Sequence, residues 1–440
     1  MTSRLSPVSP LLLVIVLAGS TPTRWETRVG DPGGAGHAQQ VASAPSAAAS
    51  PISGGPPDKP LVVVTENQQR LRVVPLATGL SHPWGLAFLP DGRSMLVTER
   101  PGRLRIIRDG ALDPTPIPGV PKVNPTFIGG LNDVALHPEF AKNQYVYLSY
   151  SKDGPRGVTL ALARGRFTGT ELVEVRDIFV ADAWEMGGPS AAEGGGTFGG
   201  RMLFARDGLL YVTVGDRDTR VLGDDATVRS RAQSLNEHMG KVLRLRDDGT
   251  IPKDNPFVGR AGAKPEIYTY GHRNAYGLAF HPETGELWEC EFGPLGGDEL
   301  NVLHPGRNYG WPLVSMGRNY TGLPVSSEPW WRPGMEMPRF FWSPSVNPTN
   351  ILFYTGTRFP GWRGMLIVSG LGSKQLQLLR ITKEGNVIGR PLSILNQLGV
   401  RFRIVRQGPD GFLYVLTEMR NAGNDDLDGA LLRIEPADAD

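Results

Sequence analysis

Polar residues gather in a few short phrases of the chain, and their types limit the chemistry that is possible. The phrase GHRN holds Arg273 and Asn274, and the phrase TVGD ends on Asp216. Arg401 and Arg403 lie two residues apart in the phrase RFR, and guanidinium groups pair bidentately with carboxylates. The chain has no Gly-x-Ser-x-Gly elbow, no His-Glu-x-x-His motif and no phosphate-cradling loop, which argues against several common hydrolase and nucleotide-binding classes.

A recurring strand–turn–strand phrase supplies the elements that position these residues. Within one copy Leu210, Val212 and Val214 point one way and the residues between them point the other, which is the period of a β-strand. Asp-Gly pairs follow in several copies and favour tight hairpin turns, because glycine accepts a positive φ. The copies begin at Gly85, Asp133, Arg201, Gly277, Arg363 and Val405.

Six copies predict an all-β fold, a six-bladed β-propeller of four-stranded antiparallel blades. A pair of β-sandwiches or a generic β-barrel is the alternative, whereas a parallel α/β fold is disfavoured because no long helical periodicity separates the strands. The insertions at residues 182–200, 216–235 and 305–350 are too long for hairpin turns. Long loops on a rigid scaffold commonly carry functional sites, so we expect the site there.

Composition and charge exclude some partners. The 440 residues include 46 Lys and Arg against 44 Asp and Glu, so no broad basic face is expected and nucleic acid is not a predicted partner. The single cysteine, Cys290, cannot form an intramolecular disulfide, and its apolar setting predicts a buried position in a strand.

The N-terminus has the features of an export signal. Arg4 precedes the apolar run 11–18, which is too short to span a bilayer, so we predict a signal peptide at residues 1–20, with an uncleaved anchor as the alternative. Residues 21–60 are rich in Pro, Gly, Ala and Ser and are predicted to be a disordered linker. The propeller domain then spans residues 61–440. This organisation predicts a periplasmic or secreted protein with no membrane span after signal cleavage.

The phrases HPWGLAF, GGLNDVALHPEF, FGGR, GHRN, GGDELN, NYGWP and RFRIVRQGPDG occur in this order. Together they resemble the glucose/sorbosone dehydrogenase family, in particular its soluble aldose dehydrogenases that use pyrroloquinoline quinone (PQQ). The resemblance runs from about Leu76 to Ile434. It implies an exported oxidoreductase that takes a small sugar, oxidises the C1 hydroxyl to a lactone and passes hydride to PQQ, aided by Ca²⁺. The electron acceptor that follows is left open.

The resemblance also implies roles for individual residues. PQQ carries three carboxylates, and the positions matching its contacts are Arg273, Asn274, Trp342, Arg401 and Arg403. Ca²⁺ prefers oxygen ligands. The carbonyls of Gly293 and Pro294 match ligands of a calcium at the quinone, those of Glu299 and Tyr309 match ligands of a structural calcium, and Asp216 matches a carboxylate that supports the catalytic base.

Each role has a purely structural alternative. Arg273 could be a surface arginine paired with Glu266. Arg401 and Arg403 could be solvated on one face of a strand. The remaining alternatives are that Trp342 belongs to the core and that the segment around Glu299 is an ordinary turn.

Several positions depart from the family pattern. Thr197 stands where the family has the histidine base, and a threonine hydroxyl does not accept a proton near neutral pH as imidazole does. Weak aldose oxidation is therefore expected unless another base operates, the candidates being Glu193, His238 and His272. The other departures are Ile128 for a glutamine, Gly372 for a lysine near Lys374, and Phe292 and Tyr276 for polar residues.

Two functions therefore compete at this point. The first is an exported quinoprotein sugar dehydrogenase, diverged at its active centre. The second is a catalytically silent propeller that binds a carbohydrate or a protein partner, since propellers carry many functions. A polar, arginine-rich pocket around Thr197, Ile128 and Gly372 favours the enzyme. A plug formed by Phe127, Ile128, Phe292 and Tyr276 favours the binding protein.

Overall fold

The computed structural model describes residues 55–125, 128–184, 196–218, 226–326, 330–419 and 427–437. All of them belong to one compact unit, His37–Asp440. The predicted signal peptide (residues 1–20), residues 21–54 of the predicted linker, Phe127 and Glu193 lie outside the described residues. Among those that are described, no helix has the length and apolar character needed to cross a membrane.

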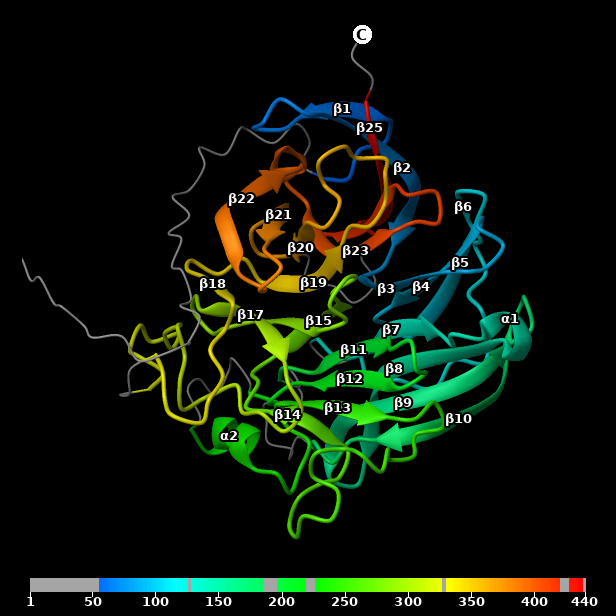
Figure 1. The fold of residues 1–440 in the computed structure, drawn as a ribbon. Coiled ribbons are helices and arrows are strands. Elements are labelled where there is room, and N and C mark those ends of the chain that lie inside the picture. The colour runs from blue at the N-terminus through cyan, green and yellow to red at the C-terminus, as the bar shows by residue number, and fades with distance from the viewer. Residues whose placement is uncertain are drawn as a thin grey trace, which may run out of the picture. The chain divides into compact units, whose positions relative to one another are not determined.

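The described residues form six antiparallel sheets, and most of their strands are labelled in Figure 1. Helices are short: α1 (Phe140–Asn143), α2 (Ala226–Ser230) and two 3₁₀ turns at Arg231–Gln233 and Asn396–Leu398. The first two sheets contain β3 (Pro83–Phe88), β4 (Ser94–Glu99), β5 (Arg103–Arg108) and β6 (Ala111–Leu112), and then β7 (Leu131–Leu136), β8 (Tyr145–Gly154), β9 (Gly157–Phe167) and β10 (Leu172–Val180). The next two contain β11 (Gly199–Phe204), β12 (Leu210–Val214), β13 (Lys241–Leu245) and β14 (Ile267–Tyr270), and then β15 (Ala275–Phe280), β16 (Leu287–Glu291), β17 (Asp298–Leu303) and β18 (Phe340–Trp342). The last two contain β19 (Pro348–Phe353), β20 (Leu366–Gly370), β21 (Gln375–Ile381) and β22 (Val387–Ile394), and then β23 (Arg401–Gln407), β24 (Leu413–Glu418), β25 (Gly429–Pro436), β2 (Arg70–Leu80) and β1 (Leu61–Val64).

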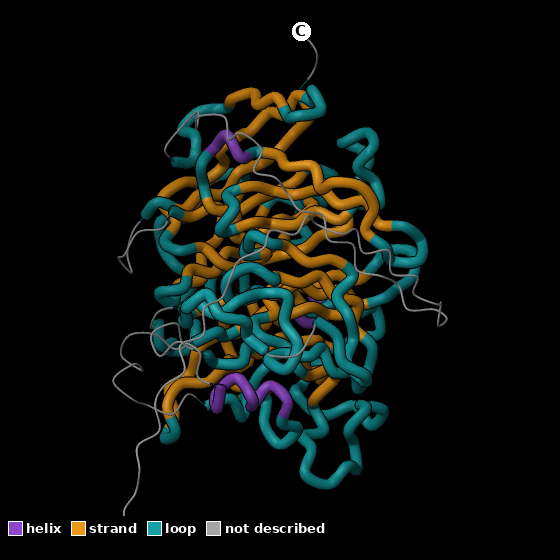
Figure 2. The backbone as a smooth tube through the Cα atoms, turned by 90° about the vertical axis from the view of Figure 1, so that its left-hand side faces the viewer, coloured by secondary structure: helices purple, strands orange, loops and turns teal. Residues whose placement is uncertain are grey.

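These sheets are the blades of a β-propeller. The first strand of each blade contacts the first strand of the next, in the order β3, β7, β11, β15, β19 and β23, and β23 contacts β3 to close the ring. Figure 2, turned by 90°, shows the strands in orange crossing this body. The predicted six-bladed propeller is therefore confirmed, and neither a sandwich pair nor a barrel describes it. One blade has five strands rather than four, because β1 adds to its edge.

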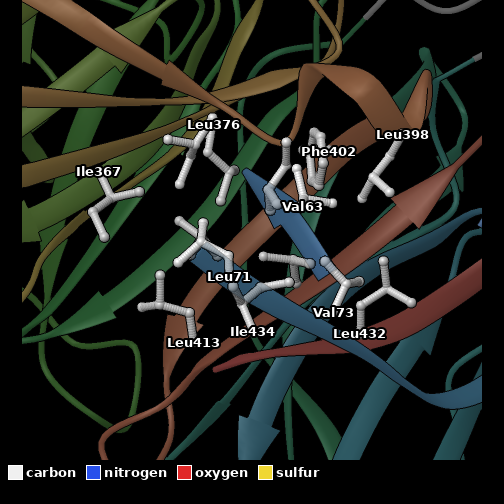
Figure 3. Close-up of a cluster of buried hydrophobic side chains, with 14 of the residues drawn as sticks. Val63, Leu71, Val73, Ile367, Leu376, Leu398, Phe402, Leu413, Leu432 and Ile434 are labelled. Carbon is white, nitrogen blue, oxygen red and sulfur yellow. The ribbon is translucent and has the colours of Figure 1, made fainter. Parts of the chain in front are cut away.

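The ring is closed by strands from opposite ends of the chain. β2 pairs with β25 in an antiparallel ladder from Leu71↔Pro436 to Leu80↔Gly429. The side chains at this junction form a fully buried hydrophobic cluster, shown in Figure 3, that includes Val73, Leu413 and Leu432. Burying such side chains contributes about 1.5–3 kcal/mol each, so this junction holds the ring shut.

An ion pair at the centre ties neighbouring blades together. Arg201 on β11 lies 3.0 Å from the carboxylate of Asp133 on β7, and both side chains are almost fully buried. The same guanidinium donates to the carbonyls of Tyr276 on β15 and Thr349 on β19. Four inner strands are thereby fixed around one charged group, which makes the scaffold rigid where the site is built.

The local predictions on turns and on the cysteine also hold. Gly92, Gly208 and Gly411 each follow an aspartate in a hairpin turn and adopt φ between 70° and 83°. Cys290 is fully buried in β16, and its Sγ donates to the carbonyl of Pro348.

Candidate functional site

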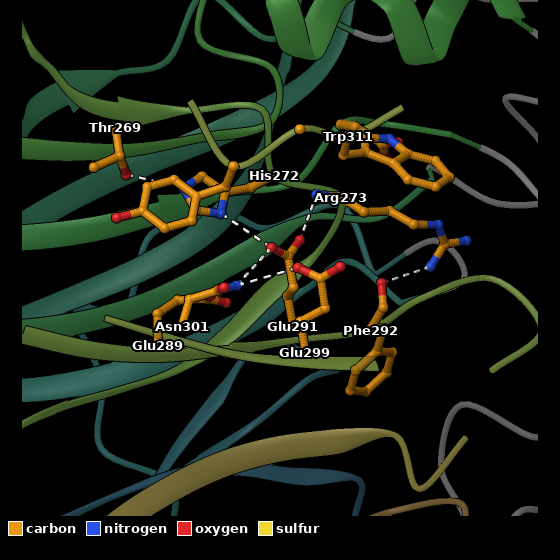
Figure 4. A network of polar contacts seen from close by, with 12 residues as sticks. Thr269, His272, Arg273, Glu289, Glu291, Phe292, Glu299, Asn301 and Trp311 are labelled. Atoms are coloured by element: carbon orange, nitrogen blue, oxygen red, sulfur yellow. Dashed lines mark hydrogen bonds and ion pairs between the residues drawn. The ribbon is translucent and has the colours of Figure 1, made fainter. Parts of the chain in front are cut away.

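A pocket opens beside the inner strands where β14–β15, β16–β17 and the long insertion after β17 meet. The predicted insertion 305–350 contributes to it, as expected. Figure 4 shows part of the wall from close by. The pocket is lined by Arg273, Glu291, Phe292, Gly293, Gly297, Glu299, Trp311, Val314 and Ser315.

Arg273 is a buried part of this wall and not a surface arginine. Its side chain is 6% exposed, and Nη1 donates to the carbonyls of Phe292 (3.2 Å) and Gly293 (3.0 Å). Its guanidinium lies 5.5 Å from the centroid of the Trp311 ring, a cation–π distance. The alternative pairing with Glu266 is wrong, because Glu266 instead pairs with His238 at 3.4 Å.

Thr197 and Asp216 lie directly behind the pocket wall. The Thr197 hydroxyl donates to Oδ1 of Asp216, and Oδ2 of Asp216 accepts from the indole N–H of Trp311 at 2.6 Å. The backbone N–H of Asp218 also donates to Oδ1, at 3.0 Å. Burial, followed by the charge of Asp218, raises the pKa of Asp216 to about 6. Sequence reasoning therefore placed the two residues together correctly but missed Trp311.

Gly215 explains why these two side chains meet. A Cβ on Gly215 would lie 2.1 Å from the carbonyl oxygen of Thr197, so any other residue would force the two segments apart. The Gly215 N–H instead donates to the carbonyl of Phe198 at 3.0 Å. Glycine in the phrase TVGD thus lets the backbone carrying Asp216 pack against that of Thr197.

Arginines surround one buried glutamate on the last blade. Glu418 ends β24 and accepts from Arg403 at 2.7 Å, while Arg401 lies 3.4 Å away as its cross-strand partner. Arg100 also faces this carboxylate. Burial opposes ionisation of Glu418, yet the charge of Arg403, a hydrogen bond from His82 and the charges of Arg100 and Arg401 hold its pKa well below the usual range. Three guanidinium groups against one carboxylate leave an excess of positive charge.

Two aromatic residues, Tyr276 and Phe292, connect this arginine cluster to the pocket. Tyr276 influences the pKa of Arg100 and packs edge-on against Phe292 of the pocket, with ring centroids 4.9 Å apart. Among the described residues, Nε of Arg403 and Nε of Arg273 are buried without a hydrogen-bond acceptor. Each of the two arginine sites thus has an unused donor, and Arg273 is the one that lines the pocket.

On the other side of the pocket lies a buried carboxylate network, drawn in Figure 4. The Asn301 amide group donates to Glu289 at 3.1 Å, Glu291 at 3.3 Å and Glu299 at 3.4 Å, so one NH₂ faces three carboxylates. His272 approaches Glu291 at 3.1 Å. Burial, followed by the charge of Glu291, raises the pKa values of Glu289 and Glu299.

The predicted calcium ligands flank this network. Gly293 follows β16 and its carbonyl faces Arg273, while Pro294 is buried beside it. Glu299 belongs to the network through its side chain, and Tyr309 stacks on His272 with ring centroids 4.8 Å apart. Glu299 lies on strand β17, so the alternative of an ordinary turn is wrong.

The remaining cofactor positions differ in their surroundings. Asn274 is 2% exposed, and its side-chain oxygen accepts from the N–H of Gly199, two residues after Thr197, at 3.1 Å. Trp342 lies in a hydrophobic cluster, and its indole N–H donates to Gln377 at 2.7 Å. Its environment is that of the core, although its backbone carbonyl accepts from Gly297 of the pocket.

The other departures from the family pattern are structurally accommodated. Ile128 packs partly buried against the cluster that contains Phe198. A Cβ on Gly372 would lie 2.1 Å from Oδ1 of Asn347, so a lysine there requires that side chain to move. Lys374 has a left-handed backbone, with φ of 54°.

The two described histidines proposed as bases are already engaged. His238 accepts from the N–H of Asp182 through Nδ1, and its Nε2 faces Glu266. His272 is fully buried between Thr269 and Glu291. Neither histidine presents a ring nitrogen to the pocket.

Family comparison agrees with the fold and the phrases. The model of the glucose/sorbosone dehydrogenase family matches residues 80–432. Because this match covers most of the chain, the protein belongs to the glucose/sorbosone dehydrogenase family, which confirms the resemblance seen in the sequence.

Relatives include characterised dehydrogenases. The aldose sugar dehydrogenase YliI of Escherichia coli is 38% identical over 361 residues, which cover 81% of this chain and 91% of the relative. A crystal structure of a glucose dehydrogenase is 40% identical with a TM-score of 0.74, covering 82% and 98% of the two chains. The PQQ-bound aldose sugar dehydrogenase of Streptomyces coelicolor is 27% identical with a TM-score of 0.64, covering 86% and 100%. The general dehydrogenase assignment agrees with these relatives.

Proposed function

We propose that the protein is an exported aldose dehydrogenase that binds PQQ and Ca²⁺ and oxidises the C1 hydroxyl of a small sugar to a lactone. The observation that carries this proposal is the excess of arginine around one buried carboxylate of the last blade. Arg100, Arg401 and Arg403 share one carboxylate, Glu418, and Arg403 retains an unused Nε donor. A cofactor with three carboxylates fits this excess, because guanidinium binds carboxylate with paired hydrogen bonds.

Arg273 and Asn274 would hold the cofactor on the opposite side. Arg273 is fixed by two backbone carbonyls and by the Trp311 ring, so its unused Nε already has a set direction. Bound PQQ would supply the two-electron oxidation, and the protein would supply placement and exclusion of water. A PQQ-bound relative of the same fold supports the assignment.

The carboxylate network fits Ca²⁺. Glu291 and Glu299 line the pocket, and Glu289 Oε1 and Asn301 Oδ1 are buried acceptors without a partner among the described residues. Oxygen atoms are the ligands that Ca²⁺ prefers, and a divalent cation would offset the repulsion between the three carboxylates. In this proposal the carbonyls of Glu299 and Tyr309 would bind a structural calcium, and those of Gly293 and Pro294 would bind a separate calcium at the quinone.

Export follows from the N-terminal run and the linker and is part of the proposal. Sequencing the N-terminus of the protein recovered from outside the cytoplasm tests it, with cleavage near residue 20 as the expected result. An intact Met1 would overturn it.

The activity is tested by incubating purified protein with PQQ and Ca²⁺ and measuring aldose-dependent reduction of an artificial dye. We expect turnover that requires both additions. PQQ binding without aldose turnover would contradict the catalytic part, and absence of PQQ binding would favour a silent propeller that binds a carbohydrate or protein.

A further inference from the structure

Thr197 occupies the position of the expected base, yet its hydroxyl is not isolated. It donates to Oδ1 of Asp216 and accepts from the backbone N–H of Arg217 at 3.0 Å. A hydroxyl oxygen has one proton to donate and two lone pairs. With one lone pair used by Arg217 and no further donor found among the described residues, the second lone pair is available to a substrate hydroxyl.

Building on the proposed function, we infer that Thr197 and Asp216 form a proton relay that replaces the histidine base: Thr197 contacts the sugar hydroxyl and Asp216 is the final proton acceptor. Thr197 is 8% exposed and Asp216 is fully buried, so Thr197 is the more accessible member of the pair. Oδ2 of Asp216 is held by the Trp311 indole, which keeps Oδ1 directed at Thr197.

In this relay two linked transfers carry a net proton from the sugar to Asp216. The hydroxyl proton of sugar C1 passes to Oγ1 of Thr197 while the proton already on Oγ1 passes to Oδ1 of Asp216. The C1–O bond becomes the lactone carbonyl as the C1–H bond breaks, and that hydrogen leaves with both electrons as hydride to a quinone, the oxidant of the proposed function. Asp216 ends protonated and Thr197 is unchanged.

The charges around Asp216 suit this role. Asp218 opposes its ionisation, whereas Arg273, the Thr197 hydrogen bond and the Asp218 N–H favour it. Asp218 is itself neutralised by Arg229 at 2.9 Å. Buried Lys241 also faces this region, and burial lowers the pKa of Lys241 to about 7. The resulting pKa of Asp216, about 6, leaves it mostly ionised at neutral pH and close to the range of an efficient base.

The relay is tested first without cofactor. The indole N–H of Trp311 donates to Asp216, so its ¹⁵N-detected NMR signal, assigned with Trp311→Phe, reports protonation of Asp216. We expect a midpoint near pH 6 in the wild type and in Thr197→Ser. Thr197→Val should move it upward, because a hydrogen bond that stabilises the carboxylate is lost. An unchanged midpoint in Thr197→Val would overturn the pairing.

Turnover of the PQQ-loaded protein is the second readout. Thr197→Ser should stay within about tenfold of the wild type, and Thr197→Val and Asp216→Asn should lose about 10²–10⁴-fold, the usual contribution of general base catalysis. Thr159→Val is the matched control, since Thr159 is a buried threonine that donates to the Ala181 carbonyl away from the pocket. Full activity of Thr197→Val would overturn the relay alone, whereas an inactive wild type would overturn the proposed function and the relay with it.

Discussion

Two buried acidic regions lie on either side of the pocket, and they differ in how their charge is satisfied. Asp216 receives hydrogen bonds from Thr197, the Trp311 indole and the N–H of Asp218. In the second region Glu289 and Glu299 rely on the amide of Asn301, Glu291 also accepts from the N–H of Arg273 and approaches His272, and two acceptor atoms have no partner among the described residues. The protein supplies enough hydrogen-bond donors for the carboxylate of the first region, but too few for the acceptor atoms of the second.

This difference indicates what each region is built to receive. A buried carboxylate with a complete set of donors is stable as an anion and can gain a proton. Buried carboxylates without enough donors are costly unless they take up protons or a cation. This comparison favours the proposed roles, proton transfer at Asp216 and cation binding in the network around Asn301.

The largest effect is expected from calcium. If a cation completes the second region, Ca²⁺ at 100 times its Kd should raise the free energy of unfolding by about 2.7 kcal/mol. Thermal unfolding in EDTA and in excess Ca²⁺ measures this, with Mg²⁺ as the control that should stabilise less because it demands stricter geometry. Equal thermal unfolding midpoints in EDTA and in Ca²⁺ would mean that no cation completes the second region, and the proposed difference between the two regions would be wrong.

A smaller change in the free energy of unfolding is expected from Trp311→Phe in the first region. Loss of a hydrogen bond to a charged group costs about 1.5–3 kcal/mol, and the cost applies while Asp216 is ionised. The folded-state pKa of Asp216 is raised to about 6, so the folded protein binds this proton more tightly than the unfolded chain does. The stability gained from that proton is fully present below about pH 4 and is lost as the pH rises through 6. Losing a donor raises that pKa further.

Urea unfolding of the wild type and Trp311→Phe at pH 5 and pH 8 measures this effect. The deficit of the variant should be larger at pH 8 than at pH 5. A deficit of the same size at both values would mean that the indole contributes only packing.

The smallest effect is expected from Glu289→Gln, and its sign should depend on calcium. In EDTA the substitution removes a carboxyl group whose pKa is raised by burial and then by the charge of Glu291, and it should therefore stabilise the protein. In excess Ca²⁺ it should stabilise less or destabilise. The experiment is the same thermal unfolding series, and stabilisation of equal size in both buffers would argue against a cation in the network.

Sequence reasoning reached the fold because its signals are local. The period-2 strands recur in each blade and Asp-Gly turns occur in several of them, so the blade count could be predicted. The closure of the ring could not be predicted in this way, since β2 pairs with β25 from the far end of the chain and only the fold brings them together.

The site was predicted in part for the same reason. Arg401 and Arg403 stand out in their phrase, but Glu418 was missed because its pairing depends on the register between β23 and β24. Trp311 lies in the phrase NYGWP, yet its contact with Asp216 joins residues 95 apart. Motifs indicated the candidate segments, and tertiary contacts determine which of their atoms meet.

The most direct test of the proposed function is the affinity for PQQ, measured in Ca²⁺ for the wild type and for Arg403→Gln. We expect the wild type to bind and Arg403→Gln to lose about 10–150-fold, because a charged hydrogen bond worth about 1.5–3 kcal/mol is removed and Glu418 keeps its negative charge. Arg433→Gln, which breaks a partly exposed pair with Glu435, should bind as the wild type does. A wild type that does not bind PQQ, or an Arg403→Gln variant that binds equally well, would contradict the account.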